Sequence, residues 1–576
     1  MKQLILILAM AMAAAGQDAR LAGLDEWVAK AVAEAKVPGL AIAIVADGKV
    51  VHSKGYGFRD LERKLPVTGK TLFAIGSVTK SFTVATLGTL ADEGKFEWDK
   101  PVREYLPEFR MFESTVTEQL TTRDMVTHRS GLPRHDLLWY TSEFPLESLV
   151  KRLRYLSPSQ PLRARFQYNN LMYATAGHLS SVIAGKPWET LVRERMLVPL
   201  GMTNSRMNLE EASRDGEVAL PYMRDFKTGL VKEVPPFRNM TVAPAGSIYS
   251  CVEDMAKYLQ MHIDQGEYGG KAVVGRTTVK QMQQAQMAAG GEPPFPEMDG
   301  SAYGMGLSVS YYRGRKMVGH GGAIDGMRAS MMFLPKERIG VVVLWNLQGS
   351  ALGDNLPYVV FDRWLGAPET DWLGRTRKSE ESARAQMTAA VGAGVSGRKK
   401  DTRPSHAMGE YAGTFTHPGY GRIVVRERGG NLVMQFNRME RALEHFHYDT
   451  FQVPAQEFDN FAKFKVSFVT NTEGDIARLR ANVEPSVPET VFERVADASM
   501  FQSGFLRPFT GEYESQPKPV VVSLRGESQL LLNGGKLTPL FGTRFRVEGQ
   551  TGVSVEFRAG EMVVYTPNAE LVLKKR

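Results

Sequence analysis

The stretch Leu72-Phe73-Ala74-Ile75-Gly76-Ser77-Val78-Thr79-Lys80 places a serine hydroxyl and a lysine amine three residues apart, directly after a short apolar run. The residues that follow repeat apolar side chains with helical spacing as far as Gly94. Because residues i and i+3 share one face of a helix, we expect Lys80 to reach the hydroxyl of Ser77. A serine at a helix start also lies beside backbone N–H groups without partners in the helix. The stretch therefore predicts a nucleophile with an adjacent base.

The Ser-x-x-Lys spacing is weak evidence by itself, since the chain contains it four times. The other copies begin at Ser148, Ser396 and Ser515. Pro517 lies inside the last copy and disfavours a helix, Ser396 lies in a Gly- and Lys-rich stretch, and no strand precedes Ser148. Only the copy at Ser77 joins a strand-like run to a helical one.

Two further motifs support the choice of Ser77. Residues 168–170 form a Tyr-x-Asn before a helical run, and residues 320–322 form a His-x-Gly before two strand-like runs. In this order and spacing the three motifs resemble the serine β-lactamase and penicillin-binding-protein superfamily. Within it, the chain is most similar to class C β-lactamases, D-alanyl-D-alanine carboxypeptidases, D-aminopeptidases and related esterases. The resemblance implies an α+β domain over residues 20–370, with an antiparallel sheet flanked by helices and a helical subdomain.

The resemblance also implies roles for individual residues. Ser77 would form an acyl-enzyme, while Lys80 and Tyr168 share the serine proton and pass it to the leaving group. Both side chains would need pKa values below their ordinary 10.4 and 10 for this at neutral pH. Asn170 would hold Lys80 and a substrate amide by hydrogen bonds.

The third motif is expected to line the other side of the site. The N–H groups of Ser77 and Ala323 would form an oxyanion hole, and Gly322 would let a substrate approach the backbone closely. His320 replaces the lysine common in the superfamily, and would bind a substrate carboxylate when protonated or donate to Tyr168 when neutral. A literal Lys-Thr-Gly begins at Lys227, but its surroundings predict an exposed turn, so we favour His320.

Composition and the N-terminus set limits on location and partners. The 576 residues exceed one ordinary core, and 43% hydrophobic and 23% charged residues are typical of soluble globular proteins. The net charge of +8 is spread along the chain, which argues against nucleic-acid binding. Residues 1–19 resemble a secretory signal peptide, and no other segment is apolar enough to cross a bilayer. We therefore expect an exported protein without an integral membrane segment.

The C-terminal third has a different pattern. Residues 371–405 predict a helical or flexible connector, and residues 406–496 and 504–576 predict two all-β modules. Gly409-Glu410-Tyr411 is echoed by Gly511-Glu512-Tyr513, which indicates an internal repeat. The two modules resemble the small lipocalin-like barrels attached to relatives of D-aminopeptidase.

The sequence implies no cofactor and no metal site, since it contains no His-Glu-x-x-His, no paired cysteines and no Gly-rich dinucleotide loop. The favoured hypothesis is a serine hydrolase acting on small D-amino-acid-containing peptides or amides. A carboxylesterase with the same site is the alternative, because a Ser/Lys/Tyr site does not itself select amide over ester. A β-lactamase or a catalytically retired binding protein is a weaker hypothesis. The sequence predicts neither the physiological substrate nor the oligomeric state.

Overall fold

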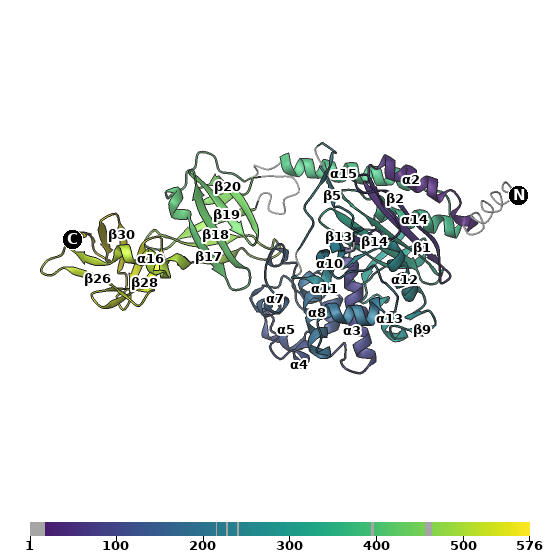
Figure 1. Cartoon of the computed structure of the whole chain (residues 1–576), viewed down its shortest axis with the longest axis horizontal. Coiled ribbons are helices and arrows are strands. Elements are labelled where there is room, and N and C mark those ends of the chain that lie inside the picture. Colours follow the sequence, from purple (N-terminus) through teal and green to yellow (C-terminus); the bar gives the residue numbers. More distant parts are fainter. Residues whose placement is uncertain (1–17, 215, 226–227, 239–240, 393–396, 455–463) are drawn as a thin grey trace. The chain divides into compact units, whose positions relative to one another are not determined.

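The computed structural model describes residues 18–576, except for residues 215, 226–227, 239–240, 393–396 and 455–463. The chain divides near residue 394 into two compact units, which are described separately below (Figure 1). Nearly all of the predicted signal peptide, and Lys227 of the literal Lys-Thr-Gly, lie outside the described residues.

The first unit is built on a nine-stranded antiparallel sheet that joins distant parts of the sequence. Strands β1 (Gly39–Ala46) and β15 (Ile339–Trp345) pair in its interior and are buried along their whole length. Both strands consist almost entirely of apolar residues, because helices cover both faces of the sheet here. Helix α12 (Val252–Ile263) covers one face, and α14 (Leu352–Leu365), with α2 (Leu24–Glu34), covers the other. The strand order is β10 (Met287–Ala288), β11 (Met298–Tyr303), β12 (Ser308–Tyr312), β13 (Arg315–Ile324), β14 (Met327–Leu334), β15, β1, β2 (Lys49–Asp60) and β3 (Leu65–Pro66).

A helical part is inserted between the N-terminal and C-terminal strands of this sheet. At its centre lies α3 (Thr79–Asp92), which is buried on every side from Thr79 to Leu90 and packs against α8 (Asn170–Ala184) and α11 (Ala243–Gly246). None of the helices in the described part of the chain has both the length and the apolar character of a membrane span. Other helices and strands of the first unit are α4 (Val102–Tyr105), α5 (Ser114–Gln119), α6 (Thr122–Val126), α7 (Leu146–Arg152), α9 (Trp188–Val192), α10 (Leu209–Arg214), α13 (Arg276–Met282), β4 (Phe73–Ala74), β5 (Tyr222–Arg224), β6 (Val231–Glu233), β7 (Tyr249–Ser250), β8 (Glu267–Tyr268), β9 (Lys271–Ala272) and β16 (Leu347–Gln348).

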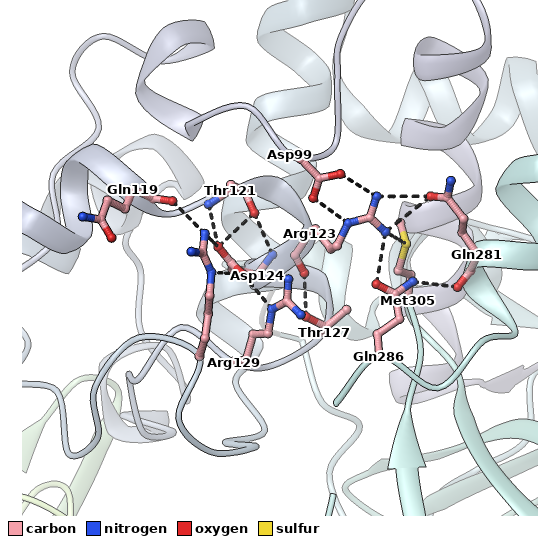
Figure 2. A network of polar contacts seen from close by, with 11 residues as sticks. Asp99, Gln119, Thr121, Arg123, Asp124, Thr127, Arg129, Gln281, Gln286 and Met305 are labelled. Carbon is pink, nitrogen blue, oxygen red and sulfur yellow. Dashed lines mark hydrogen bonds and ion pairs between the residues drawn. The ribbon is translucent and has the colours of Figure 1, made fainter. Parts of the chain in front are cut away.

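A buried carboxylate organises the loops of the helical part (Figure 2). Asp124 is fully buried and accepts hydrogen bonds from the guanidinium groups of Arg129 at 2.6 Å and Arg163 at 2.8 Å. The backbone N–H of Arg163 also donates to the carbonyl of Arg129 at 2.7 Å. The network therefore holds the loop that carries His128 against the segment that leads to Tyr168. Beside it, Arg123 donates to the side chains of Asp99, Gln281 and Gln286.

The second unit is all-β, as the sequence predicts. Its first module is a closed barrel of eight strands, and its second is an eight-stranded sheet. An isolated bridge between Tyr513 and Lys575 brings the two ends of this second sheet together, so that it is nearly closed. The strands are β17 (Gly413–His417), β18 (Gly421–Arg428), β19 (Asn431–Phe436), β20 (Met439–His447), β21 (Thr450–Gln452), β22 (Lys465–Thr470), β23 (Ile476–Ala481) and β24 (Thr490–Val495), then β25 (Gly511–Tyr513), β26 (Val520–Arg525), β27 (Gln529–Leu532), β28 (Gly535–Phe541), β29 (Arg544–Val547), β30 (Ser554–Arg558), β31 (Glu561–Tyr565) and β32 (Glu570–Lys574). The predicted fold class, α+β followed by small β-barrels, is confirmed.

The similar stretches 409–411 and 511–513 do not occupy equivalent positions in the two modules. Residues 409–411 lie in a 3-10 turn, Met408–Tyr411, whereas residues 511–513 form strand β25 itself. The strand that corresponds to β25 is β17, because both follow a 3-10 turn and open their module. Tyr411 and Tyr513 are both buried, so the echo reflects shared burial and not a shared backbone position.

Helix α15 (Trp372–Gly392) occupies the first part of the predicted connector. Its first turn packs into the first unit, where Trp372 is 2% exposed and donates from its indole N–H to Asp362 at 2.8 Å. One turn later, the hydroxyl of Thr376 accepts a hydrogen bond from the amide of Asn355 at 2.8 Å. The segment 371–405 therefore begins as part of the core of the first unit.

Candidate active site

Ser77 lies where a short strand meets the buried helix α3. Strand β4 leads into the 3-10 turn η2 (Gly76–Val78), and α3 follows at Thr79. The N–H of Ile75 donates to the carbonyl of Ile248 at 2.9 Å, which ties the turn to the segment after α11. Ser77 is partly exposed, whereas Gly76 and Val78 on either side are buried. The hydroxyl is thus accessible on a turn that its surroundings hold firmly.

The amine of Lys80 has three polar neighbours, and they differ in what they can do. Its Nζ lies 3.0 Å from Ser77 Oγ, 2.8 Å from Asn170 Oδ1 and 2.9 Å from the carbonyl oxygen of Ala245. The oxygens of Asn170 and Ala245 can only accept hydrogen bonds, whereas a hydroxyl can also donate one. A neutral amine has two N–H bonds and one lone pair. The two acceptors take both N–H bonds, and the lone pair then faces the hydroxyl of Ser77.

The electrostatic surroundings favour that neutral form. Lys80 is completely buried, and burial holds the pKa of its amine well below the usual value. The guanidinium of Arg134 lowers this pKa further, while the carboxylate of Asp136 raises it. Lys80 is therefore suited to accept a proton near neutral pH.

Tyr168 lies beside the same hydroxyl but differs from the sequence-based expectation. Its phenol is hydrogen-bonded to Ser77, and its ring lies 4.8 Å from Nζ of Lys80. Burial nevertheless raises the pKa of this phenol above its ordinary value of 10, and the bond to Ser77 and the nearby Arg134 offset only part of the rise. The expected lowering of the Tyr168 pKa is therefore wrong. Tyr168 remains a neutral hydroxyl, which can relay a proton but does not act as a resident base.

Asn170, the first residue of α8, positions Lys80 through its side-chain oxygen. Its amide nitrogen lies 3.4 Å from a carboxylate oxygen of Asp136, which fixes the orientation of the amide. Asp136 also accepts from Arg134 at 2.5 Å and from the indole of Trp139 at 2.7 Å. The amide nitrogen predicted to bind a substrate amide thus already has a long contact to a carboxylate.

His320 is buried, and its ring is oriented by two neighbours. One ring nitrogen, Nδ1, is bonded to the carbonyl oxygen of Gly321, so it carries the hydrogen. The other, Nε2, then accepts from the hydroxyl of Tyr303 at 2.8 Å. Burial and the nearby Lys80 lower the pKa of His320 to about 4. His320 is therefore uncharged at neutral pH, and neither the carboxylate-binding role nor donation to Tyr168 fits this arrangement.

Gly322 contacts the protein itself and not an open space for substrate. A Cβ atom at this position would lie 2.0 Å from the carbonyl oxygen of Ile75, so only glycine lets β13 approach the turn that carries Ser77. A Cβ on Gly76 would lie 2.7 Å from the backbone nitrogen of Ala323, which places that nitrogen beside the same turn. The expected role of Gly322 in substrate approach is corrected to one in packing. Ala323 is exposed and lies where the oxyanion hole is predicted.

The edge of β13 beside Ser77 is open. Strand β12 pairs with β13 only as far as Gly319, so in the described part of the chain no strand covers that edge from His320 to Ile324. Beside it, a cavity of about 330 Å³ is lined by Tyr168, His320, Phe166 and Tyr303, among other residues. The site thus has an open strand edge and an aromatic-lined space next to Tyr168.

Sequence reasoning missed several residues that surround these groups. The ring of buried His128 lies 4.3 Å from that of Tyr168, and its Nδ1 accepts the N–H of Asn169 at 3.0 Å. Arg134 lies 5.3 Å from the Tyr168 ring. His128 lies in residues 127–133, a stretch that also resembles the superfamily, so this was the available signal for it, whereas Arg134 follows that stretch. Tyr303 had no such signal.

The copy of the motif at Ser148 forms no comparable site. Lys151 donates to Glu147 at 2.6 Å, and Ser148 lies 3.4 Å from the guanidinium of Arg152. Ser396 lies outside the described residues. Among the described residues, no three His, Cys, Asp or Glu side chains are grouped so that they could hold a metal ion.

Residues 24–363 match the family model described as Beta-lactamase, which covers more than half of the chain. The chain belongs to the beta-lactamase and penicillin-binding-protein family of serine hydrolases. Residues 397–494 match a second model, a domain of unknown function (DUF3471), which coincides with the closed barrel β17–β24.

Several individual proteins are similar to this chain. "Unguisins hydrolase ungD'" of Aspergillus campestris is 30% identical over 425 residues, covering 70% of this chain and 75% of that protein. "Protein flp" of Staphylococcus aureus is 24% identical over 331 residues, covering 56% of this chain and 62% of its own length. Two solved structures share the fold. The octameric penicillin-binding protein homologue from Pyrococcus abyssi has a TM-score of 0.52 at 23% identity, covering 82% of this chain and 100% of that chain. The D-amino acid amidase from Ochrobactrum anthropi SV3, in complex with D-phenylalanine, has a TM-score of 0.50 at 23% identity, covering 60% and 99%.

Proposed function

We propose that this protein hydrolyses amide bonds of small D-amino-acid-containing peptides or amides through an acyl-enzyme on Ser77. The observation that carries the proposal is the arrangement around Lys80. Two obligate acceptors, Asn170 Oδ1 and the carbonyl oxygen of Ala245, leave the lone pair of a neutral amine facing Ser77 Oγ. This is the geometry of a general base poised on a nucleophile.

In the acylation step, the proton of Ser77 moves to Nζ of Lys80 while Oγ forms a bond to the substrate carbonyl carbon. The oxygen that becomes negative is stabilised by the N–H groups of Ser77 and Ala323. Collapse of this intermediate breaks the C–N bond. Tyr168 donates its hydroxyl proton to the leaving nitrogen and regains a proton from Lys80. Both side chains thus return to their starting charge, and water repeats the sequence to release the acid.

The choice of substrate class is supported by similar proteins and by the charge of His320. One relative is named as a hydrolase of unguisins, and one structure of similar fold is that of a D-amino acid amidase in complex with D-phenylalanine. The uncharged His320 also lacks the positive charge that would attract the carboxylate of a β-lactam. Ester hydrolysis with the same site is the second candidate, since acylation of Ser77 by an ester needs the same groups.

We further propose that the protein is exported. The support is the N-terminal sequence, in which one lysine precedes an apolar run of about a dozen residues and then small residues. Amino-terminal sequencing of the protein recovered from its native host tests this, since cleavage near residue 19 is the expected result. A mature chain that still begins at Met1 would contradict export.

Labelling with a fluorophosphonate, followed by intact-mass and peptide mass spectrometry, tests the site. We expect one adduct, on the peptide that contains Ser77, and none in Ser77→Ala. Profiling against D-amino-acid amides, short acyl esters and a chromogenic cephalosporin then tests the substrate class. An adduct on Ser148, or full activity in Ser77→Ala, would overturn the proposal.

A further inference from the structure

One carboxylate near the site has no partner of opposite charge. Asp325 follows the last residue of β13 and lies two residues beyond Ala323. It is half-buried and accepts a hydrogen bond from the hydroxyl of Tyr140 at 2.8 Å. Within the described chain, no lysine, arginine or histidine forms an ion pair with it. Burial raises the pKa of this carboxyl, as expected for a charge whose environment does not compensate it.

If the leaving group of a substrate lies on the Tyr168 side of Ser77, the acyl part of the substrate lies near Asp325. The group that protonates the leaving nitrogen must be within hydrogen-bond reach of it. That group is Tyr168, whose ring lies 6.2 Å from the ring of His320. The cavity next to these two side chains gives the leaving group space on that side of Ala323. The acyl part therefore extends the other way along the open edge of β13, toward Asp325, which lies about 7 Å beyond Ala323 at the usual rise of a strand.

A second segment lies along the same part of the substrate. The segment from Asp136 to Tyr140 contacts Asn170 at its first residue and Asp325 at its last. The ring of Tyr140 is stacked on that of Phe237, with centroids 5.6 Å apart and planes inclined by 23°. Aromatic faces attract cations, and so does an unpaired carboxylate. The acyl side thus combines a negative charge with aromatic rings.

We propose that Asp325 binds the free ammonium group of an amino-terminal substrate residue, so that the enzyme prefers substrates with a free amine next to the scissile carbonyl. This inference rests on the proposed function and names the substrate class more narrowly. A substrate ammonium supplies the positive charge that Asp325 lacks in the protein. An acylated amine is uncharged and leaves the half-buried carboxylate without a partner.

The test compares three substrates that share one leaving group. They are phenylalanine p-nitroanilide, its N-acetyl derivative and the des-amino analogue 3-phenylpropionyl p-nitroanilide, with both enantiomers of the first two. For the wild type, we expect kcat/KM for the free amine to exceed that for the other two by about 10- to 100-fold, the usual size of a hydrogen bond to a charged group. In Asp325→Asn this ratio should fall to within about threefold of one, while Asp325→Glu should keep part of it.

Two further variants test whether the preference depends on the carboxylate of Asp325 itself. Tyr140→Phe removes the only described hydrogen bond to Asp325 but leaves the carboxylate, so the preference should persist. Asp47→Asn, in the distant turn between β1 and β2, removes a different carboxylate and should leave the ratio unchanged.

The outcomes distinguish this inference from the function on which it rests. Equal kcat/KM for the free-amine and des-amino substrates in the wild type would overturn it, whatever the fate of the variants. An undiminished preference in folded Asp325→Asn would do the same. If no substrate is cleaved in a manner that needs Ser77, the proposed function is overturned, and the inference falls with it.

Discussion

Replacement of Gly322 by alanine is expected to damage catalysis through the position of a single added atom. The new Cβ would lie 2.0 Å from the carbonyl oxygen of Ile75, and non-bonded atoms of this kind stay at least 3.0 Å apart. Either β13 or the turn that carries Ser77 must therefore move by about 1 Å. Ile75 directly precedes that turn, and Ala323 follows Gly322. The displacement therefore separates the two N–H groups of the predicted oxyanion hole.

The size of the effect follows from that displacement. A misplacement of about 1 Å in a catalytic constellation costs about 100-fold in rate, and loss of one oxyanion donor costs about 100- to 1,000-fold in kcat. An inserted methyl group in a packed region lowers the free energy of unfolding by about 1–3 kcal/mol. We expect Gly322→Ala to remain folded, with kcat reduced by about 100- to 1,000-fold.

Gly321→Ala is the matched control, one residue away on the same strand. Its added Cβ would meet only the carbonyl oxygen of Ala329, at 3.7 Å, which is an ordinary contact. The assay measures kcat on an amide that the wild type cleaves, the rate of fluorophosphonate labelling and the melting temperature of all three proteins. Full kcat in Gly322→Ala, or an equal loss in Gly321→Ala, would show that the close approach to Ile75 does not set the active geometry.

Three more predictions follow from the charges and bonds around the site. Because only the neutral amine of Lys80 can accept the serine proton, kcat/KM should rise with pH through a pKa well below 10.5. In Lys80→Ala, kcat/KM should fall by at least about 100-fold and should no longer rise with pH. In Tyr168→Phe, kcat/KM should fall by a similar factor, but its rise with pH should remain. With the pKa of His320 lowered to about 4, His320→Gln should leave the shape of the pH–rate profile between pH 6 and 8 unchanged, and a wild-type inflection near pH 6.5 that this variant loses would contradict the buried, neutral ring. Removal of one charge from the buried Asp124 network in Asp124→Asn should lower the free energy of unfolding by about 3–5 kcal/mol in urea titrations. Since the pKa of Asp124 is lowered in the folded protein, its contribution is present above about pH 3.9 and should be lost as pH falls through the lower folded value.

The parts of the site that could be predicted from the sequence are those that a local pattern encodes. The strand, turn and helix around Ser77 depend on residues 72–94, and the structure has β4, η2 and α3 there. Likewise, β14 and β15 correspond to the two strand-like runs predicted after residues 320–322. The pKa values could not be predicted in this way. The neutral state of Tyr168 depends on its burial among other segments, and its neighbours include His128, which is 40 positions away in the sequence. No local pattern reports such burial.

The same limit explains why the sequence misjudged the third motif. A histidine in a His-x-Gly motif indicates a titratable group near pH 6.5, because that is the ordinary value for the side chain. In the folded protein, Lys80 and His320 share one buried region, and a positive charge on Lys80 disfavours protonation of His320. Nε2 of His320 already accepts a hydrogen bond from the hydroxyl of Tyr303, so hydrogen bonding as well as burial favours the neutral ring. A site that keeps His320 uncharged offers no histidine cation to a carboxylate on the leaving side, while Asp325 offers an unpaired anion on the acyl side. This charge pattern is the one expected for the proposed preference for a free amine. The motif alone predicts neither the neutral His320 nor the unpaired Asp325.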